Sequence, residues 1–136
     1  MTGRKCFVLI GLFLLLLGLV SCGFEKNNMT KIRDLEYTVL EDEEVPEEFL
    51  LQIQGAKAGE FKLTYTANGY LYIARGYGMQ DTGGYSIQME ELYLAENAVY
   101  FDAILIGPEQ ADATGTVSYP YIVIKTEAID RNVVFE

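Results

Sequence analysis

Histidine and tryptophan are absent from the 136 residues, and only two cysteines and three prolines are present. Without histidine the chain lacks the commonest general base and the commonest zinc ligand. Cations are also scarce, since 10 Lys+Arg stand against 20 Asp+Glu, for a formal charge of −10. This balance argues against nucleic acid as a partner, because phosphates need cationic contacts. We therefore expect no catalytic residue, no metal and no cofactor.

The longest apolar run lies close to the N-terminus. Arg4 and Lys5 precede it, and it covers residues 7–20, which is shorter than the roughly 20 residues of a transmembrane helix. Its end, Leu-Val-Ser-Cys at 19–22, resembles the lipobox of bacterial lipoproteins. In that family the signal is removed before the cysteine, whose sulfur carries a diacylglyceryl group. The alternative is an ordinary secretory signal followed by a chance cysteine.

This resemblance implies three regions: a lipoprotein signal peptide at 1–21, a lipidated tether at 22–33 and a β domain at 34–136. Cys22 would be the lipidation site, so the protein would lie outside the cytoplasmic membrane in the bacterial cell envelope, held by its acyl anchor. Loss of Arg4 and Lys5 would take the formal charge from −10 to −12, and loss of Cys6 would leave no disulfide.

Alternating apolar residues predict strands over most of the remaining chain, at 34–40, 61–67, 70–74, 85–94, 99–106, 121–125 and 132–135. Asn68-Gly69 predicts a tight hairpin, because both central residues of such a turn need positive φ. Pro46 followed by two acids predicts a helix over 46–57. We expect strand 85–94 to place Ile87, Met89 and Glu91 on one face, and the apolar strand 99–106 to be buried on both faces.

The predicted fold is therefore mainly β, an antiparallel β-sandwich or curled sheet of six to seven strands with one short helix. All ten tyrosines lie after the signal peptide. They serve either as amphipathic residues of a pleated surface or as a binding face.

Two loops are candidate sites. Residues 76–84 form the densest glycine cluster, but an acid at position 81 and the lack of a following Lys-Ser/Thr exclude the two common phosphate-binding patterns. This segment is either a plain connection or a recognition loop. In the second loop Pro120 lies between Tyr119 and Tyr121, which gives either a strand entry with core tyrosines or a rigid apolar contact.

Segments 76–87 and 118–124, with the break at Gly107-Pro108 between them, resemble the PrcB C-terminal family over about residues 61–127. That family is named for a lipoprotein subunit of a surface protease complex. The resemblance implies a non-enzymatic accessory subunit that helps a secreted or surface protease fold, assemble or stay stable. We expect the protein-binding residues to be Gly83, Gly84, Tyr85, Ser86, Tyr119, Pro120 and Tyr121.

Two alternatives stay open. Residues 81–85, Asp-Thr-Gly-Gly-Tyr, resemble the Thr-Thr-Gly-Tyr loop of chagasin-like cysteine-protease inhibitors, although a glycine replaces the second threonine. Such an inhibitor would bind papain-like enzymes tightly. The second alternative is a small hydrolase that uses paired carboxylates, which a chain this acidic permits although no spacing indicates a pair.

Overall fold

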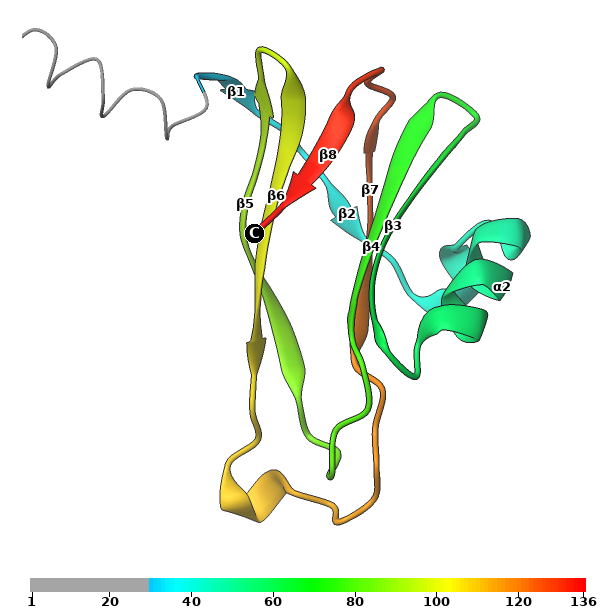
Figure 1. Cartoon of the computed structure of the whole chain (residues 1–136), viewed down its shortest axis with the longest axis vertical. Coiled ribbons are helices and arrows are strands. Elements are labelled where there is room, and N and C mark those ends of the chain that lie inside the picture. The colour runs from blue at the N-terminus through cyan, green and yellow to red at the C-terminus, as the bar shows by residue number, and fades with distance from the viewer. Residues whose placement is uncertain (1–29) are drawn as a thin grey trace, which may run out of the picture. The chain divides into compact units, whose positions relative to one another are not determined.

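Two four-stranded sheets form the framework of the computed structural model, which describes residues 30–136 (Figure 1). The predicted signal peptide, Cys22 and residues 22–29 of the predicted tether lie outside the described residues. Sheet A has the strand order β1-β5-β6-β8 and sheet B the order β2-β7-β4-β3. The strands are β1 Lys31–Asp34, β2 Thr38–Val39, β3 Glu60–Ala67, β4 Tyr70–Tyr77, β5 Ser86–Ala95, β6 Ala98–Ile106, β7 Tyr121–Glu127 and β8 Asn132–Phe135.

The predicted fold class is confirmed, but one predicted strand is divided. Residues 34–40 do not form a single strand, because the chain crosses from sheet A to sheet B within them. Leu35 is buried between the two sheets, and its N–H donates to the Leu92 carbonyl of sheet A at 2.9 Å. The N–H of Leu40 donates to the Val123 carbonyl of sheet B at 2.9 Å. β1 therefore begins at Lys31, three residues before the predicted start of the domain.

The hairpin and the helix form where the sequence predicts them. Asn68 and Gly69 have φ of 55° and 82° and join β3 to β4. Helix α2, Glu47–Ala56, begins after Pro46, whose carbonyl accepts the Leu50 N–H at 2.9 Å. Phe49 and Ile53 are one turn apart on its buried face and are fully excluded from solvent.

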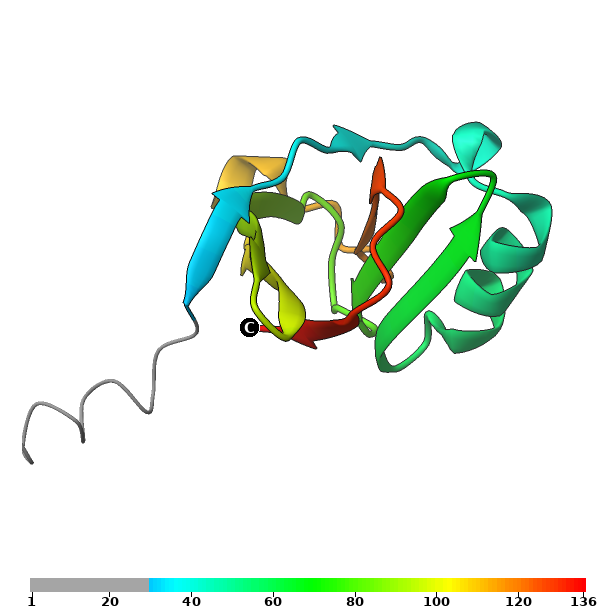
Figure 2. The same ribbon diagram turned by 90° about the horizontal axis from the view of Figure 1, so that it is seen from above.

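The molecule has three layers, with sheet B in the middle (Figure 2). Alternate residues of sheet B face opposite sides and build two cores. Ile73 and Ile124 pack against sheet A, whereas Tyr72 and Val123 pack against α2. The central strands of sheet B are thus covered on both faces, and they hold the two loops described below.

A β-bulge changes the inner face of β5 from the predicted one. The register with β6 shifts between Met89 and Glu91, so Glu90 is an extra residue and both glutamates are exposed. Ile87 and Met89 share one face as predicted, and this face is the inner one, but Glu91 does not lie on it, and Leu92 is the next residue in the core. The bulge accommodates Glu90 as an extra residue. The residues that follow it therefore keep their apolar side chains on the inner face of the strand.

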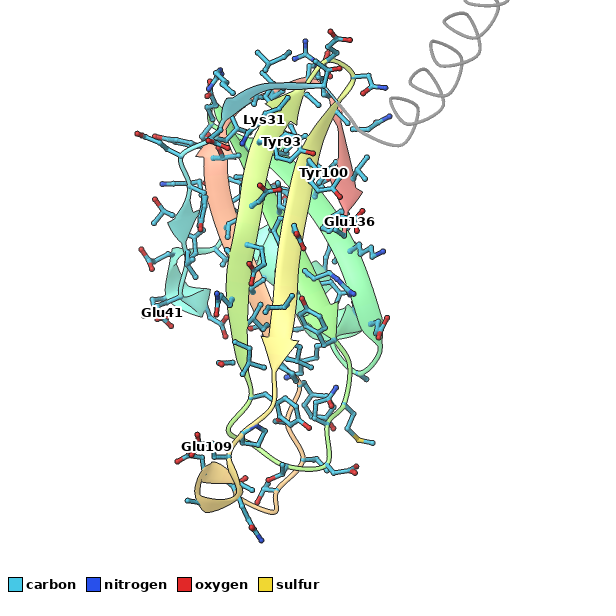
Figure 3. The ribbon with its side chains drawn as sticks, turned by 90° about the vertical axis from the view of Figure 1, so that its left-hand side faces the viewer. Lys31, Glu41, Tyr93, Tyr100, Glu109 and Glu136 are labelled. Carbon is cyan, nitrogen blue, oxygen red and sulfur yellow. The ribbon has the colours of Figure 1, made fainter. Side chains whose placement is uncertain are left out.

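The prediction that strand 99–106 is buried on both faces is wrong. β6 alternates, with Phe101 buried and Ile104 43% exposed, because no layer covers the outer face of sheet A within the described residues. Tyr93 and Tyr100 stack on this face with ring centroids 4.7 Å apart. Figure 3 shows them between Lys31 and Glu136. The pKa of Tyr100 is raised, mainly by a hydrogen bond with Glu136 and secondly by burial.

β8 departs from the antiparallel pattern. The chain crosses from β7 in sheet B back to sheet A, and β8 then pairs with β6 in parallel. Val133 and Phe135 extend the core between the sheets. β8 covers only the first half of β6, since its register ends at Phe101↔Phe135.

Candidate functional site

The two candidate loops meet at one end of the sandwich, shown at the bottom of Figure 1. Residues 78–85 connect β4 to β5 and residues 107–120 connect β6 to β7, so each loop crosses from one sheet to the other. Gln80 and Ser118 join the loops as an antiparallel bridge. The Gln80 N–H donates to the Ser118 carbonyl at 2.8 Å, and the reverse bond is 3.1 Å. We call residues 78–85 and 107–120 the paired loops.

Hydroxyl groups join the paired loops further. The N–H of Gly83 donates to Thr114 Oγ1 at 3.0 Å, and the N–H of Gly115 donates to Thr82 Oγ1 at 2.8 Å. Ser118 Oγ donates to the Thr82 carbonyl at 2.8 Å. Each loop therefore satisfies backbone groups of the other, which fixes both in one arrangement. Thr82 and Thr114 were not among the predicted site residues, because a polar side chain within a loop gives no periodic signal.

The glycines of the first loop are explained by close packing. Gly84 has a φ of 90°, and a Cβ on it would lie 2.5 Å from the Asp112 carbonyl oxygen and 2.9 Å from Pro108 Cβ. A Cβ on Gly83 would lie 2.8 Å from Thr114 Oγ1. Both positions require glycine so that the second loop can approach. Gly83 and Gly84 thus shape the site and offer no side chain to a partner.

Tyr85 and Ser86 mark the entry to β5. Tyr85 is half-buried, and its ring lies next to Gly107 of the second loop, where an added Cβ would be 3.6 Å from Tyr85 Cε1. Ser86 is exposed at the first position of β5, opposite Ile106. Figure 3 shows Glu109, just before the short 3-10 helix Gln110–Asp112, at this same end.

Tyr119 and Pro120 lie on the paired loops, but with different environments. Tyr119 is 36% exposed, and the Nζ of Lys57 lies 5.6 Å from its ring centroid. The Pro120 carbonyl accepts a hydrogen bond of 3.1 Å from the Tyr77 N–H, which attaches the loop to the end of β4. Of the two tyrosines beside Pro120, Tyr119 is therefore the more exposed.

Tyr121 belongs to the helix-covered face of sheet B. Its ring lies 6.2 Å from that of Phe61, and its hydroxyl donates to Asp42 Oδ1 at 2.6 Å and accepts from Gln54 Nε2 at 3.4 Å. Burial, together with the Asp42 hydrogen bond, raises the pKa of the Tyr121 hydroxyl to about 12. These contacts hold the start of β7 against α2, which makes Tyr121 a structural neighbour of the paired loops.

Two exposed apolar residues of the paired loops carry no sequence signal. Met79 is 55% exposed and Val117 is 49% exposed. The Gln80–Ser118 bridge places Met79 opposite Tyr119, and Val117 lies on the same side as Tyr119 because it is two residues away. Three large apolar side chains therefore gather on a hydrogen-bonded loop pair, a combination typical of protein interfaces.

Within residues 30–136, no group of three or more histidine, cysteine, aspartate or glutamate side chains is placed to hold a metal ion. In the same part of the chain, no helix is both long enough and apolar enough to cross a bilayer.

The architecture is that of a β-sandwich with paired loops at one end. Residues 71–127 match the family model described as PrcB C-terminal, so the chain carries a PrcB C-terminal domain over β4 to β7 and both paired loops. A search of curated proteins and a search of solved structures found no match.

Proposed function

We propose that this protein is a non-enzymatic accessory subunit of a secreted or surface protease complex, held in the bacterial cell envelope by a lipid on Cys22. The observation that carries the proposal is the exposed apolar cluster of Met79, Val117 and Tyr119 on the paired loops. It lies within the segment that matches the PrcB C-terminal model. The lipobox at 19–22 supports the envelope location.

Rigidity supports a binding role for this cluster. Binding costs less when the contact residues are already ordered, and the paired loops are held by the Gln80–Ser118 bridge and the hydroxyl contacts of Thr82 and Thr114. Methionine and tyrosine are also enriched in interfaces, where they offer large contact areas.

The predicted protein-binding residues have different roles in this binding mode. Tyr119 and Pro120 contact the partner together with Met79 and Val117, and Tyr85 and Ser86 lie at the rim. Gly83 and Gly84 permit the close approach of the loops, and Tyr121 fixes the start of β7.

The test is recovery of the tagged, acylated protein from its own cell envelope, with quantitative mass spectrometry of the proteins that accompany it. We expect a protease in amounts comparable to the bait. The Met79→Ala/Tyr119→Ala variant should lose at least nine-tenths of that protease, because an interface residue of this kind contributes ~2 kcal/mol. The matched control is Tyr37→Ala, which removes a tyrosine that is 40% exposed and lies outside the paired loops.

Recovery of the protein without a protease would overturn the proposal. Equal losses in the double variant and the Tyr37 control would also overturn the assignment to the paired loops. If instead the purified protein inhibits papain-like enzymes at micromolar concentration, the chagasin-like alternative replaces the accessory-subunit proposal.

A further inference from the structure

A groove of about 740 Å³ separates the free edges of the two sheets, away from the paired loops. β3 is one of the two edge strands of sheet B and β8 one of the two edge strands of sheet A, and both can be followed in Figures 1 and 2. Lys62, Thr64 and Thr66 of β3 line one side of the groove, and Val133 and Phe135 of β8 line the other.

The edge of β3 presents unpaired backbone groups to this groove. The two-residue turn at 68–69 makes Ala67 and Tyr70 a hydrogen-bonded pair, so alternate residues of β3 direct their N–H and C=O groups away from β4. Thr66, Thr64 and Lys62 are those alternate residues. Their side chains line the groove as well, and an eight-residue strand with such an edge can accept a further strand.

The groove side of sheet B also carries two cations without a carboxylate partner, and the Nζ of Lys62 lies 5.9 Å from the Phe135 ring centroid. Lys62 and Arg75 are directly opposite each other in the β3–β4 register, where two like charges destabilise the sheet. Within residues 30–136 the ion pairs are Lys31–Asp34 and Arg33–Glu127, so neither cation pairs with a carboxylate.

Arg75 is the more constrained of the two cations. Its Nη1 donates to the Gly76 carbonyl at 2.7 Å and its guanidinium stacks on Tyr77, with Cζ 4.5 Å from the ring centroid. Its Nε and the Tyr77 hydroxyl are buried and have no hydrogen-bond partner among the described residues. Neither Arg75 nor Tyr77 lines the groove, whose charged lining residues are Lys62, Asp130 and Arg131.

We propose that this groove binds an extended acidic segment of another polypeptide, which adds to β3 as a fifth strand of sheet B. In the added strand, the residue beside Lys62 is an aspartate or glutamate that pairs with Lys62. Four residues along, beside Thr66, an apolar side chain packs on Leu71 and Val133. This site shares no residue with the paired loops, so it goes beyond the proposed function and does not depend on it.

The probes are two eight-residue peptides, acetylated and amidated, in which threonine and valine alternate around a central glutamate or a central lysine. Fluorescence anisotropy with the full-length, detergent-solubilised protein measures their binding. We expect the glutamate peptide to bind at least tenfold more tightly than the lysine peptide. Lys62→Glu should reverse that order. Lys125→Glu is the matched control, because Lys125 contacts Tyr70 and does not line the groove, and it should leave the order unchanged.

Backbone addition is tested on the probe, which leaves the protein fold untouched. N-methylation of alternate amides in the glutamate peptide blocks one hydrogen-bonding edge of the peptide at a time. Methylation of one set should abolish binding, and methylation of the other set should preserve it. Equal sensitivity to both sets would overturn strand addition, and an unchanged order in Lys62→Glu would overturn the cation site. Self-association of the protein that competes with the peptide would assign the groove to a second copy and overturn the proposal.

Discussion

At the scale of single residues, the paired loops depend on positions where only one side chain fits. Gly84 combines a φ of 90° with contacts from the Asp112 carbonyl and Pro108. A methyl group there meets backbone, which has less freedom to move than the end of a flexible side chain. The close contact between the loops therefore requires a residue without a side chain at this position.

We predict that Gly84→Ala lowers the free energy of unfolding by about 1–3 kcal/mol, because it adds strain at positive φ to a steric clash. Gly55→Ala is the opposite case, since Gly55 lies within α2 and a Cβ there meets no atom within 4 Å. That substitution should raise stability by about 0.5–1 kcal/mol. Urea denaturation measures both, and a neutral Gly84→Ala would contradict the packing of the paired loops.

The Tyr121 hydroxyl gives a prediction about pH. Its pKa is raised to about 12 in the folded protein, above the value near 10 of an unfolded chain. The stabilisation is complete below pH 10 and is lost as the pH rises from about 10 to about 12, because the unfolded chain releases the proton first. Urea denaturation at pH 8 and pH 11 should show wild type losing more stability than Tyr121→Phe. Equal losses would mean that neither burial nor the Asp42 hydrogen bond raises the pKa of the Tyr121 hydroxyl.

At the scale of elements, the β5 bulge makes a prediction about deletions. Glu90 is the extra residue between Met89 and Glu91, so its removal leaves a regular ladder with Leu92 still inward. We expect the Glu90 deletion to change stability by less than about 1 kcal/mol. Deletion of Gln88 should cost more than about 2 kcal/mol, because Ile87 then turns outward. Thermal unfolding compares the two, and an equal loss would contradict the register.

Elements set by neighbouring residues could be predicted from the sequence, and those set by distant contacts could not. The Asn68-Gly69 turn and α2 follow from local conformational preference, and both form as predicted. The division of residues 34–40 depends on two sheets competing for one segment, and the parallel pairing of β8 depends on where β7 ends.

The same distinction holds for the candidate site. The sequence indicated both paired loops, since glycine clusters and a proline between tyrosines are local signals. Their pairing through Gln80 and Ser118 is not local, and neither is the bond from Tyr121 to Asp42. Met79 and Val117 were missed because an apolar residue in a loop does not reveal whether it is buried or exposed.

At the scale of the whole molecule, negative charge opposes compactness. The formal charge is −10, and the two ion pairs within residues 30–136 lie at the surface. Screening should therefore relieve more repulsion than attraction. We predict that the urea midpoint rises between 20 mM and 500 mM NaCl, by an amount on the order of 1 kcal/mol in unfolding free energy. A falling midpoint would show that the surface ion pairs outweigh the general repulsion.

The strand order of sheet B also constrains the order in which its strands pair during folding. β3 and β4 are joined by a two-residue turn, so this hairpin can form within microseconds. β7 reaches β4 only after the chain has passed through β5 and β6. β2 pairs with β7 alone, so the earliest strand of sheet B in the sequence is the last that can join it during folding. The rate of folding should therefore be limited by closure of the long loop between β2 and β7.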